Sequence, residues 1–97
     1  MRELSFTWDE HKNRENRKKH RVTFEEARSV FFDETARQYF DPDHATDEDR
    51  FLLVGRSSRL RILLIVHCYR EIDREIRIIS ARRATRSERS EYERGQA

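Results

Sequence analysis

Residues 59–70 read RLRILLIVHCYR, and the centre of this stretch, Ile62 to Val66, is an uninterrupted run of aliphatic side chains. Side chains of a β-strand point alternately to opposite faces of the sheet, so a strand that is apolar at every position must be covered on both faces. Branched aliphatic side chains also favour strands over helices. The stretch therefore predicts the central strand of a sheet.

Further strands are expected on both sides of this central one. RFLLVG (50–55) precedes it after the short link RSS (56–58), and EIRIIS (75–80) follows it after the polar link EIDR (71–74). Short polar links between apolar runs are typical of an antiparallel meander. LSFTW (4–8) and TARQYF (35–40) have the composition of two shorter strands.

A first helix is predicted over residues 10–20, where Asp9 can cap the amino terminus. This helix has no aliphatic or aromatic side chain, so we expect it on the surface, held through Asn13, Asn16 and the stems of its long side chains.

Two further helices are marked by capping boxes, Thr23 with Glu26 and Thr85 with Glu88. The apolar residues of the second helix recur at three- and four-residue steps, at Phe24, Ala27, Val30 and Phe31. The last helix has a single large ring, Tyr92. The prediction is an α+β domain over residues 1–97: a small antiparallel sheet, two N-terminal helices on one face and a polar C-terminal helix.

Charge is distributed unevenly along the chain, although the net charge of its 97 residues is only +2. Residues 31–50 hold seven acidic and two basic side chains, whereas residues 51–97 hold eleven basic and six acidic ones. Arginine supplies 18 of the 21 basic residues. Because guanidinium groups pair bidentately with phosphate and carboxylate, this bias indicates an anionic partner or, alternatively, a solvated arginine-rich surface.

Several classes of protein and site are disfavoured by what the sequence lacks. Cys68 is the only cysteine, which excludes an internal disulfide and fits a reducing cytoplasm. The longest apolar run, ILLIV, is far too short to span a membrane. The acidic cluster at Asp41, Asp43, Asp47, Glu48 and Asp49 lacks the glycine and the spacing of a calcium loop. We therefore expect no metal and no cofactor.

The order of segments resembles that of the BrnT family of bacterial toxins. The resemblance is carried by FTWD (6–9), KHRVTFEEARSVFFD (19–33), EDRFLLVG (48–55) and RIISARRATRSERSEYE (77–93). One departure is Arg21, where the family usually has glycine; a left-handed helix stop at this position would carry a side-chain penalty.

This resemblance implies a fold related to RelE-type ribonucleases and cleavage of RNA that halts translation and growth. It also implies neutralisation by a BrnA-like antitoxin of the ribbon-helix-helix class, with operator DNA bound only through that antitoxin. The last helix would then be completed by the partner. Two other readings remain open: a non-catalytic nucleic-acid-binding or transcription-regulating module, and an interaction protein for an acidic partner.

Strand alternation suggests where RNA would be cut. It places Arg61 and His67 on one side of the central strand and Arg77 on one side of the next. If these sides coincide, the sheet has an open basic face, on which Arg61, Arg77 and Arg82 would clamp the phosphate. Arg50 would lie near its mouth, and His67 would transfer protons, although a histidine in a strand is more often a hydrogen-bonding residue.

Further RNA contacts are expected at both ends of this face. The candidates are Lys19, His20, Arg83 and Arg86, with Tyr92 as a ring on which a base could stack. The alternative is a structural role: His20 would interact with the carbonyl end of its helix, and the charged side chains of the last helix would be solvated.

Overall fold

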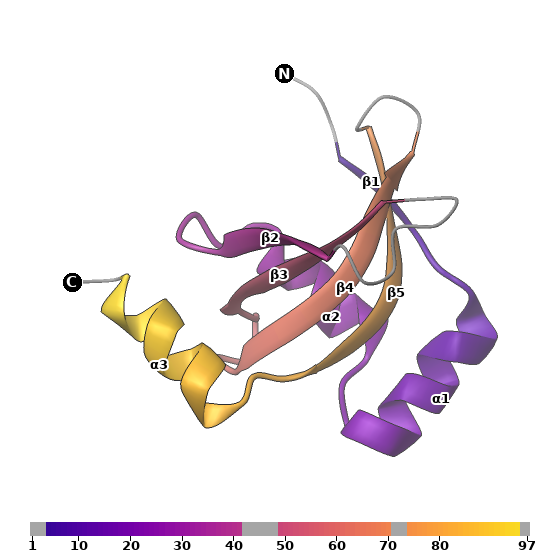
Figure 1. The fold of residues 1–97 in the computed structure, drawn as a ribbon. Coiled ribbons are helices and arrows are strands. Elements are labelled where there is room, and N and C mark those ends of the chain that lie inside the picture. The colour runs from indigo at the N-terminus through magenta and orange to yellow at the C-terminus, as the bar shows by residue number, and fades with distance from the viewer. Residues whose placement is uncertain (1–3, 42–48, 71–73, 96–97) are drawn as a thin grey trace.

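The computed structural model describes residues 4–41, 49–70 and 74–95. These form a five-stranded sheet in the order β1-β5-β4-β3-β2, with three helices (Figure 1). The strands are β1 (Ser5–Thr7), β2 (Arg37–Asp41), β3 (Arg50–Arg56), β4 (Ile62–Arg70) and β5 (Glu75–Arg83). The predicted central position of the ILLIV run is confirmed, since β4 lies in the middle of the sheet.

The predicted meander is also confirmed, because β3, β4 and β5 are antiparallel neighbours. The sheet as a whole is mixed, however, and not purely antiparallel as predicted: β1 runs parallel to β5, with Ser5 opposite Glu75. A short hairpin link forces neighbouring strands to be antiparallel, but most of the chain, from Trp8 to Arg74, separates β1 from β5. This long connection permits the parallel arrangement.

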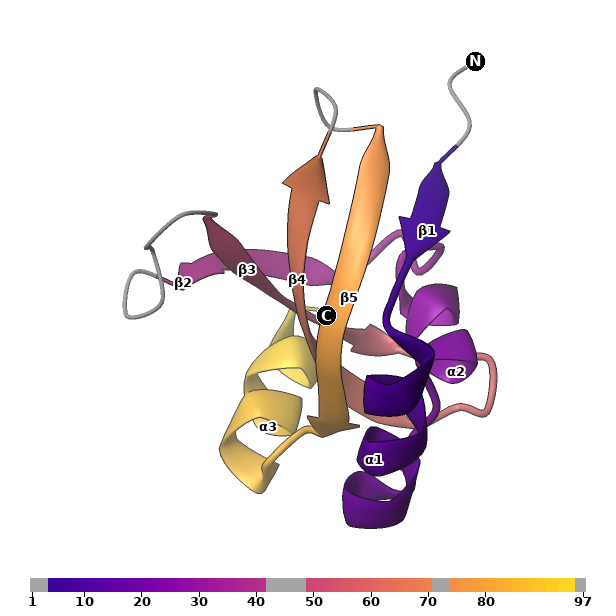
Figure 2. The same ribbon diagram turned by 90° about the vertical axis from the view of Figure 1, so that its right-hand side faces the viewer.

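The helices cover the two faces of the sheet unequally. α1 (Glu10–His20) and α2 (Phe24–Val30) lie on one face, as predicted, and α3 (Arg86–Arg94) lies on the other (Figure 2). We call these the α2 face and the α3 face. In the described parts of the chain, no helix has the length and apolar character needed to cross a membrane.

The main core lies between α2 and its face of the sheet. It consists of Val22, Phe24, Ala27, Val30, Leu53, Leu63, Ile65, Ile78 and Ala81. Phe24, Ala27 and Val30 are fully buried, which confirms the predicted apolar stripe of this helix. Burial of these side chains supplies most of the driving force for folding.

α1 is attached by amide groups in place of apolar side chains. Asn16 donates through Nδ2 to the carbonyls of Val22 and Ala81, both at 2.8 Å, and accepts the Ala81 amide at 3.1 Å. Asn13 accepts the Phe24 amide at 2.8 Å. Both asparagines are buried, so these bonds replace hydration and fix the helix against β5. The predicted role of the two asparagines is confirmed.

Candidate RNA-binding surface

A β-bulge decides which side chains share a face of the sheet. Val66 lies opposite Ser80, but His67 lies opposite Ile78, so β5 has one extra residue at this point. In a regular ladder Arg77 would share the face of His67, which is the condition on which the expected open basic face depends. Because the bulge reverses the alternation, Arg77 pairs with Cys68 on the α3 face instead. The expectation that Arg61, His67 and Arg77 share one open face is therefore wrong.

His67 lies inside the protein, on the α2 face. Its exposed fraction is 0%, its ring lies 4.9 Å from the ring of Phe31, and its Nε2 lies 3.0 Å from Oε1 of Gln38. The contact of Nδ1 with the Ile65 carbonyl would raise the pKa of His67, but the effect of burial is larger and lowers this pKa to about 4. The imidazole is therefore neutral near pH 7 and has no surface with which to meet a phosphate.

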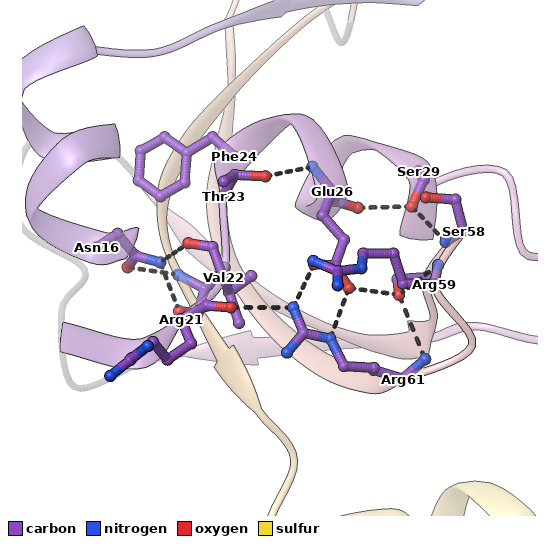
Figure 3. A network of polar contacts seen from close by, with 12 residues as sticks. Asn16, Arg21, Val22, Thr23, Phe24, Glu26, Ser29, Ser58, Arg59 and Arg61 are labelled. Carbon is purple, nitrogen blue, oxygen red and sulfur yellow. Dashed lines mark hydrogen bonds and ion pairs between the residues drawn. The ribbon is translucent and has the colours of Figure 1, made fainter. Parts of the chain in front are cut away.

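Arg61 is held at one end of the molecule by a carboxylate of α2 (Figure 3). Its Nε donates to Oε2 of Glu26 at 2.9 Å, a second guanidinium nitrogen bonds Oε1 of Glu26, and the Arg21 carbonyl accepts from it at 3.0 Å. Ser57 donates to the same carboxylate at 2.7 Å. Glu26 thus does not complete the predicted capping box with Thr23, whose side chain only accepts the Glu26 amide.

The other predicted phosphate-clamping arginines lie on the α3 face. Arg82 pairs bidentately with Glu88, at 2.9 and 3.0 Å, and Glu88 also closes the predicted capping box with Thr85. Arg77 is half-buried, and no carboxylate among the described residues lies within ion-pair distance of it. Alternation along β3 puts Arg50 on this face too.

Tyr92 belongs to a second, smaller core on the α3 face. Only 2% of it is exposed, and it packs with Val54 and Leu64. Its hydroxyl donates to Oδ2 of Asp33 at 2.6 Å and lies 3.0 Å from the Thr35 hydroxyl. The expectation that Tyr92 stacks on a base is wrong, because its ring is what attaches α3 to the sheet.

A basic cleft of about 340 Å³ opens beside α3, at the end of the sheet where Arg61 is held. It is lined by Arg56, Leu60, Arg61, Ile62, Arg83, Ala84, Arg89 and Glu93. Four arginines and a single carboxylate thus surround one hollow, which favours an anion. Two predicted site residues line the cleft, Arg61 and Arg83; Arg86, also predicted, lies exposed at the start of α3.

A second basic hollow, of about 450 Å³, lies on α1, and we call it the groove on α1. It is lined by Arg14, Arg17, Lys18 and Arg21. The hydrogen bond from Arg61 to the Arg21 carbonyl joins it to the cleft. Two predicted RNA-binding residues, the exposed Lys19 and the half-buried His20, immediately precede Arg21. The two hollows thus lie next to each other on the surface, on either side of Arg61.

Sequence reasoning did not select Arg56, Arg89 or the groove on α1 as parts of the site. Arg56 ends β3, and Arg89 lies one turn into α3, so only the packing of α3 against the sheet brings them together. A signal was present in the hairpin itself, because Arg56 and Arg61 flank one short turn. The spacing of basic residues on α1 likewise indicated one helix face.

A family model described as "Ribonuclease toxin, BrnT, of type II toxin-antitoxin system" matches residues 8–88, which is most of the chain. The chain belongs to the BrnT family. It is therefore an endoribonuclease toxin of a type II toxin-antitoxin system, which has RNA as its substrate and an antitoxin as its partner.

A solved BrnT structure shares this fold. The ribonuclease toxin BrnT of Brucella abortus superposes with a TM-score of 0.65 at 22% sequence identity, over 87% of the present chain and 100% of the Brucella chain. No curated protein sequence matches the chain significantly. The match to the Brucella toxin confirms the predicted α+β class with its sheet and three helices.

Proposed function

We propose that this BrnT toxin is a metal-independent endoribonuclease that cleaves RNA in the cytoplasm through attack of the 2′-hydroxyl on the adjacent phosphate, and so halts translation and growth. The observation that supports this most directly is the basic cleft, in which Arg56, Arg83 and Arg89 come together from three elements around Arg61. Such an arrangement can hold a phosphate and stabilise the charge that develops on it.

The reaction needs a proton acceptor, a proton donor and cations. The 2′-oxygen forms a bond to phosphorus while the bond from phosphorus to the 5′-oxygen breaks, which leaves a 2′,3′-cyclic phosphate and a 5′-hydroxyl. One group takes the proton of the 2′-hydroxyl, and another donates a proton to the leaving oxygen. No redox change or metal ion is needed for this balance.

His20 is our candidate for the proton acceptor, in place of His67. The described residues contain three histidines: His67 is buried, His11 lies beside Glu15 at the far end of α1, and His20 is half-buried next to Arg21. Imidazole is the side chain whose ordinary pKa is closest to neutrality. Lys19, its exposed neighbour, would donate a proton to the leaving oxygen.

The arginines would divide the remaining work. Arg61 is oriented by Glu26, so its guanidinium is pre-organised at the cleft and loses little freedom when it meets a phosphate. Arg50, Arg77 and Arg82, on the α3 face, would contact RNA beyond the cleft. Arg86 would add a phosphate contact at the start of α3.

We further propose that the antitoxin is BrnA-like, with a ribbon-helix-helix dimer that binds operator DNA on behalf of the complex. An antitoxin that neutralises the enzyme must cover the cleft, and the arginines there favour an acidic segment. Co-expression with the neighbouring gene should therefore abolish both growth arrest and RNA cleavage, and the complex should weaken at high salt.

The decisive experiment is incubation of the purified toxin with RNA in EDTA, followed by analysis of the product ends. We expect cyclic phosphate and 5′-hydroxyl ends. His20→Ala should lower the cleavage rate by about a hundred- to ten-thousandfold with RNA binding nearly intact. The double change Arg83→Ala and Arg89→Ala should weaken binding to all RNA sequences and reduce its salt dependence.

Arg28→Ala serves as the control for loss of a surface charge, because Arg28 is exposed on α2, away from the hollows described above. It should cleave like the wild type. Products with 5′-phosphate ends, or a strict need for Mg²⁺, would refute the mechanism. RNA binding without any cleavage would instead favour a non-catalytic role.

A further inference from the structure

Two described residues other than glycine hold the left-handed backbone conformation: Arg21, at φ 60°, and Leu60, at φ 62°. This conformation brings Cβ of an L-residue close to the following carbonyl oxygen, so glycine occupies it at lower energy. Residues that keep such strain are concentrated at functional sites. The side chains of Arg21 and Leu60 therefore need a reason to be there.

The conformation of Leu60 is required by the hairpin between β3 and β4. Leu60 donates its amide to the Ser57 carbonyl at 2.9 Å, and Ser57 donates to the Arg61 carbonyl at 2.8 Å, as in a turn followed by a left-handed residue. Glycine or asparagine is usual at such a position. The Leu60 side chain is 78% exposed, so packing within the described chain does not explain it.

Arg21 occupies the corresponding position at the end of α1. Its amide bonds the Arg17 carbonyl at 2.9 Å, and its left-handed conformation turns the chain toward α2. The carbonyl of Arg21 accepts from Arg61, but the Arg21 side chain points away from that guanidinium (Figure 3). It is exposed. As at Leu60, the backbone of Arg21 makes hydrogen bonds that the fold requires, whereas its side chain has no such role.

Both residues adjoin Arg61 and each lines one of the two basic hollows. Leu60 precedes Arg61 in the chain and contributes the most exposed large apolar side chain of the described residues to the cleft. Arg21 contributes a guanidinium to the groove on α1. A surface that offers several cations and a highly exposed apolar side chain matches a single-stranded polynucleotide, which has phosphates and apolar ring faces.

We propose that Arg21 and Leu60 are RNA-positioning residues, an inference that rests on the proposed ribonuclease function. Arg21 contacts a phosphate of the strand that passes over α1. Leu60 packs against the base or ribose of the nucleotide next to the one held in the cleft. The strand then runs from the groove on α1, past Arg61, into the cleft.

The test uses an RNA of about twelve nucleotides whose riboses are 2′-O-methylated, so that it binds but cannot be cut by 2′-hydroxyl attack. Its affinity is measured by fluorescence anisotropy for wild type, Arg21→Gly, Leu60→Gly and Leu60→Ala. We expect each variant to bind about three- to tenfold more weakly, as for loss of one contact. The salt dependence should fall by about one charge for Arg21→Gly and stay unchanged for the Leu60 variants.

Thermal melting separates this role from a structural one. Glycine relieves the backbone strain, so Arg21→Gly and Leu60→Gly should melt at or above the wild-type temperature although they bind RNA less well. Leu60→Ala keeps the strain and should melt below Leu60→Gly. Arg28→Ala is the control for charge, and should bind as the wild type does.

Wild-type affinity in both glycine variants would overturn the proposal, as would a lowered melting temperature in both. Unchanged RNA binding together with loss of antitoxin binding would also overturn it, and would assign the two side chains to the protein partner. Cleavage of unmodified RNA is measured in parallel. If the wild type binds RNA but never cuts it, the proposed mechanism fails while the positioning role stands.

Discussion

Arg61 and Glu26 connect the hairpin between β3 and β4 to α2 through an ion pair in which the Glu26 side chain is only 4% exposed and the Arg61 side chain 17%. Burial by itself would raise the pKa of Glu26, but hydrogen bonds from Arg61 and Ser57 outweigh it and hold that pKa below its usual value. The pair thus keeps its charge, and it holds one wall of the cleft in place.

Removal of this charge should destabilise the fold. Glu26→Gln leaves Arg61 without a counter-charge in a largely buried place, and we expect it to lower the free energy of unfolding by about 3 kcal/mol. Urea denaturation followed by circular dichroism measures the change. Glu91→Gln, on the exposed surface of α3, is the matched control and should have little effect. An equal loss of unfolding free energy in both variants would mean that the Arg61–Glu26 pair does not specifically stabilise the fold.

His67 should contribute to stability in a pH-dependent way. Folding keeps the imidazole neutral with a pKa of about 4, whereas the unfolded chain protonates it near the ordinary value of 6.5. The unfolded state therefore binds more protons between these values, and stability should fall as pH drops from about 6.5 toward about 4. His67→Gln should flatten this part of the profile, measured as melting temperature against pH.

The same variant tests whether His67 has a catalytic role. Once its lower stability is allowed for, the folded fraction of His67→Gln should cleave RNA within a few fold of the wild type. A loss of about a hundredfold or more at a temperature where the variant is fully folded would restore His67 as a proton-transfer group.

Asp33 should control stability at lower pH. Burial would raise its pKa, but hydrogen bonds from the Arg56 amide, the Tyr92 hydroxyl and Thr35 lower it to about 2 from 3.8. A carboxylate with a lowered pKa adds stability above its ordinary pKa and loses it on protonation, so this contribution should disappear as pH falls from about 4 to about 2. Asp33→Asn should remove that limb of the melting profile, and Glu34→Gln, exposed beside it, should leave it in place.

Tyr92→Phe probes the attachment of α3. The change keeps the ring in its core with Val54 and Leu64 and removes the contacts of the hydroxyl with Asp33 and Thr35, so we expect a loss of about 1–2 kcal/mol in the free energy of unfolding. RNA affinity should stay at the wild-type level, because the ring is buried. A selective loss of RNA binding with unchanged stability would return Tyr92 to the RNA-contacting surface.

The sequence was sufficient where local chemistry determines structure. The run Ile62 to Val66 located the central strand, Thr85 and Glu88 located the start of α3, and Asn13 and Asn16 identified how a helix without apolar residues is held. In each case the signal lies inside the element whose position or attachment it predicts.

Predictions about the site failed where distant segments decide the outcome. The extra residue in β5 at the bulge has no marker such as glycine, yet it moves Arg77 to the other face from His67. Glu26 has the spacing of a capping box, but Arg61, a half-buried arginine 35 residues away, pairs with its carboxylate. Tyr92 is buried because Val54 and Leu64 lie opposite it, which its own helix does not reveal.

The parallel pairing of β1 with β5 has a consequence for the order in which the enzyme is made. Ser5 finds its partner only when Glu75 is present, so the first strand synthesised waits for the last one, and the sheet closes late in translation. We therefore expect the nascent chain to complete its fold, and with it the basic cleft, only after β5 has emerged from the ribosome. A chain that stops before residue 75 should be digested by protease as readily as an unfolded polypeptide, which would make aborted translation of the toxin harmless to the cell.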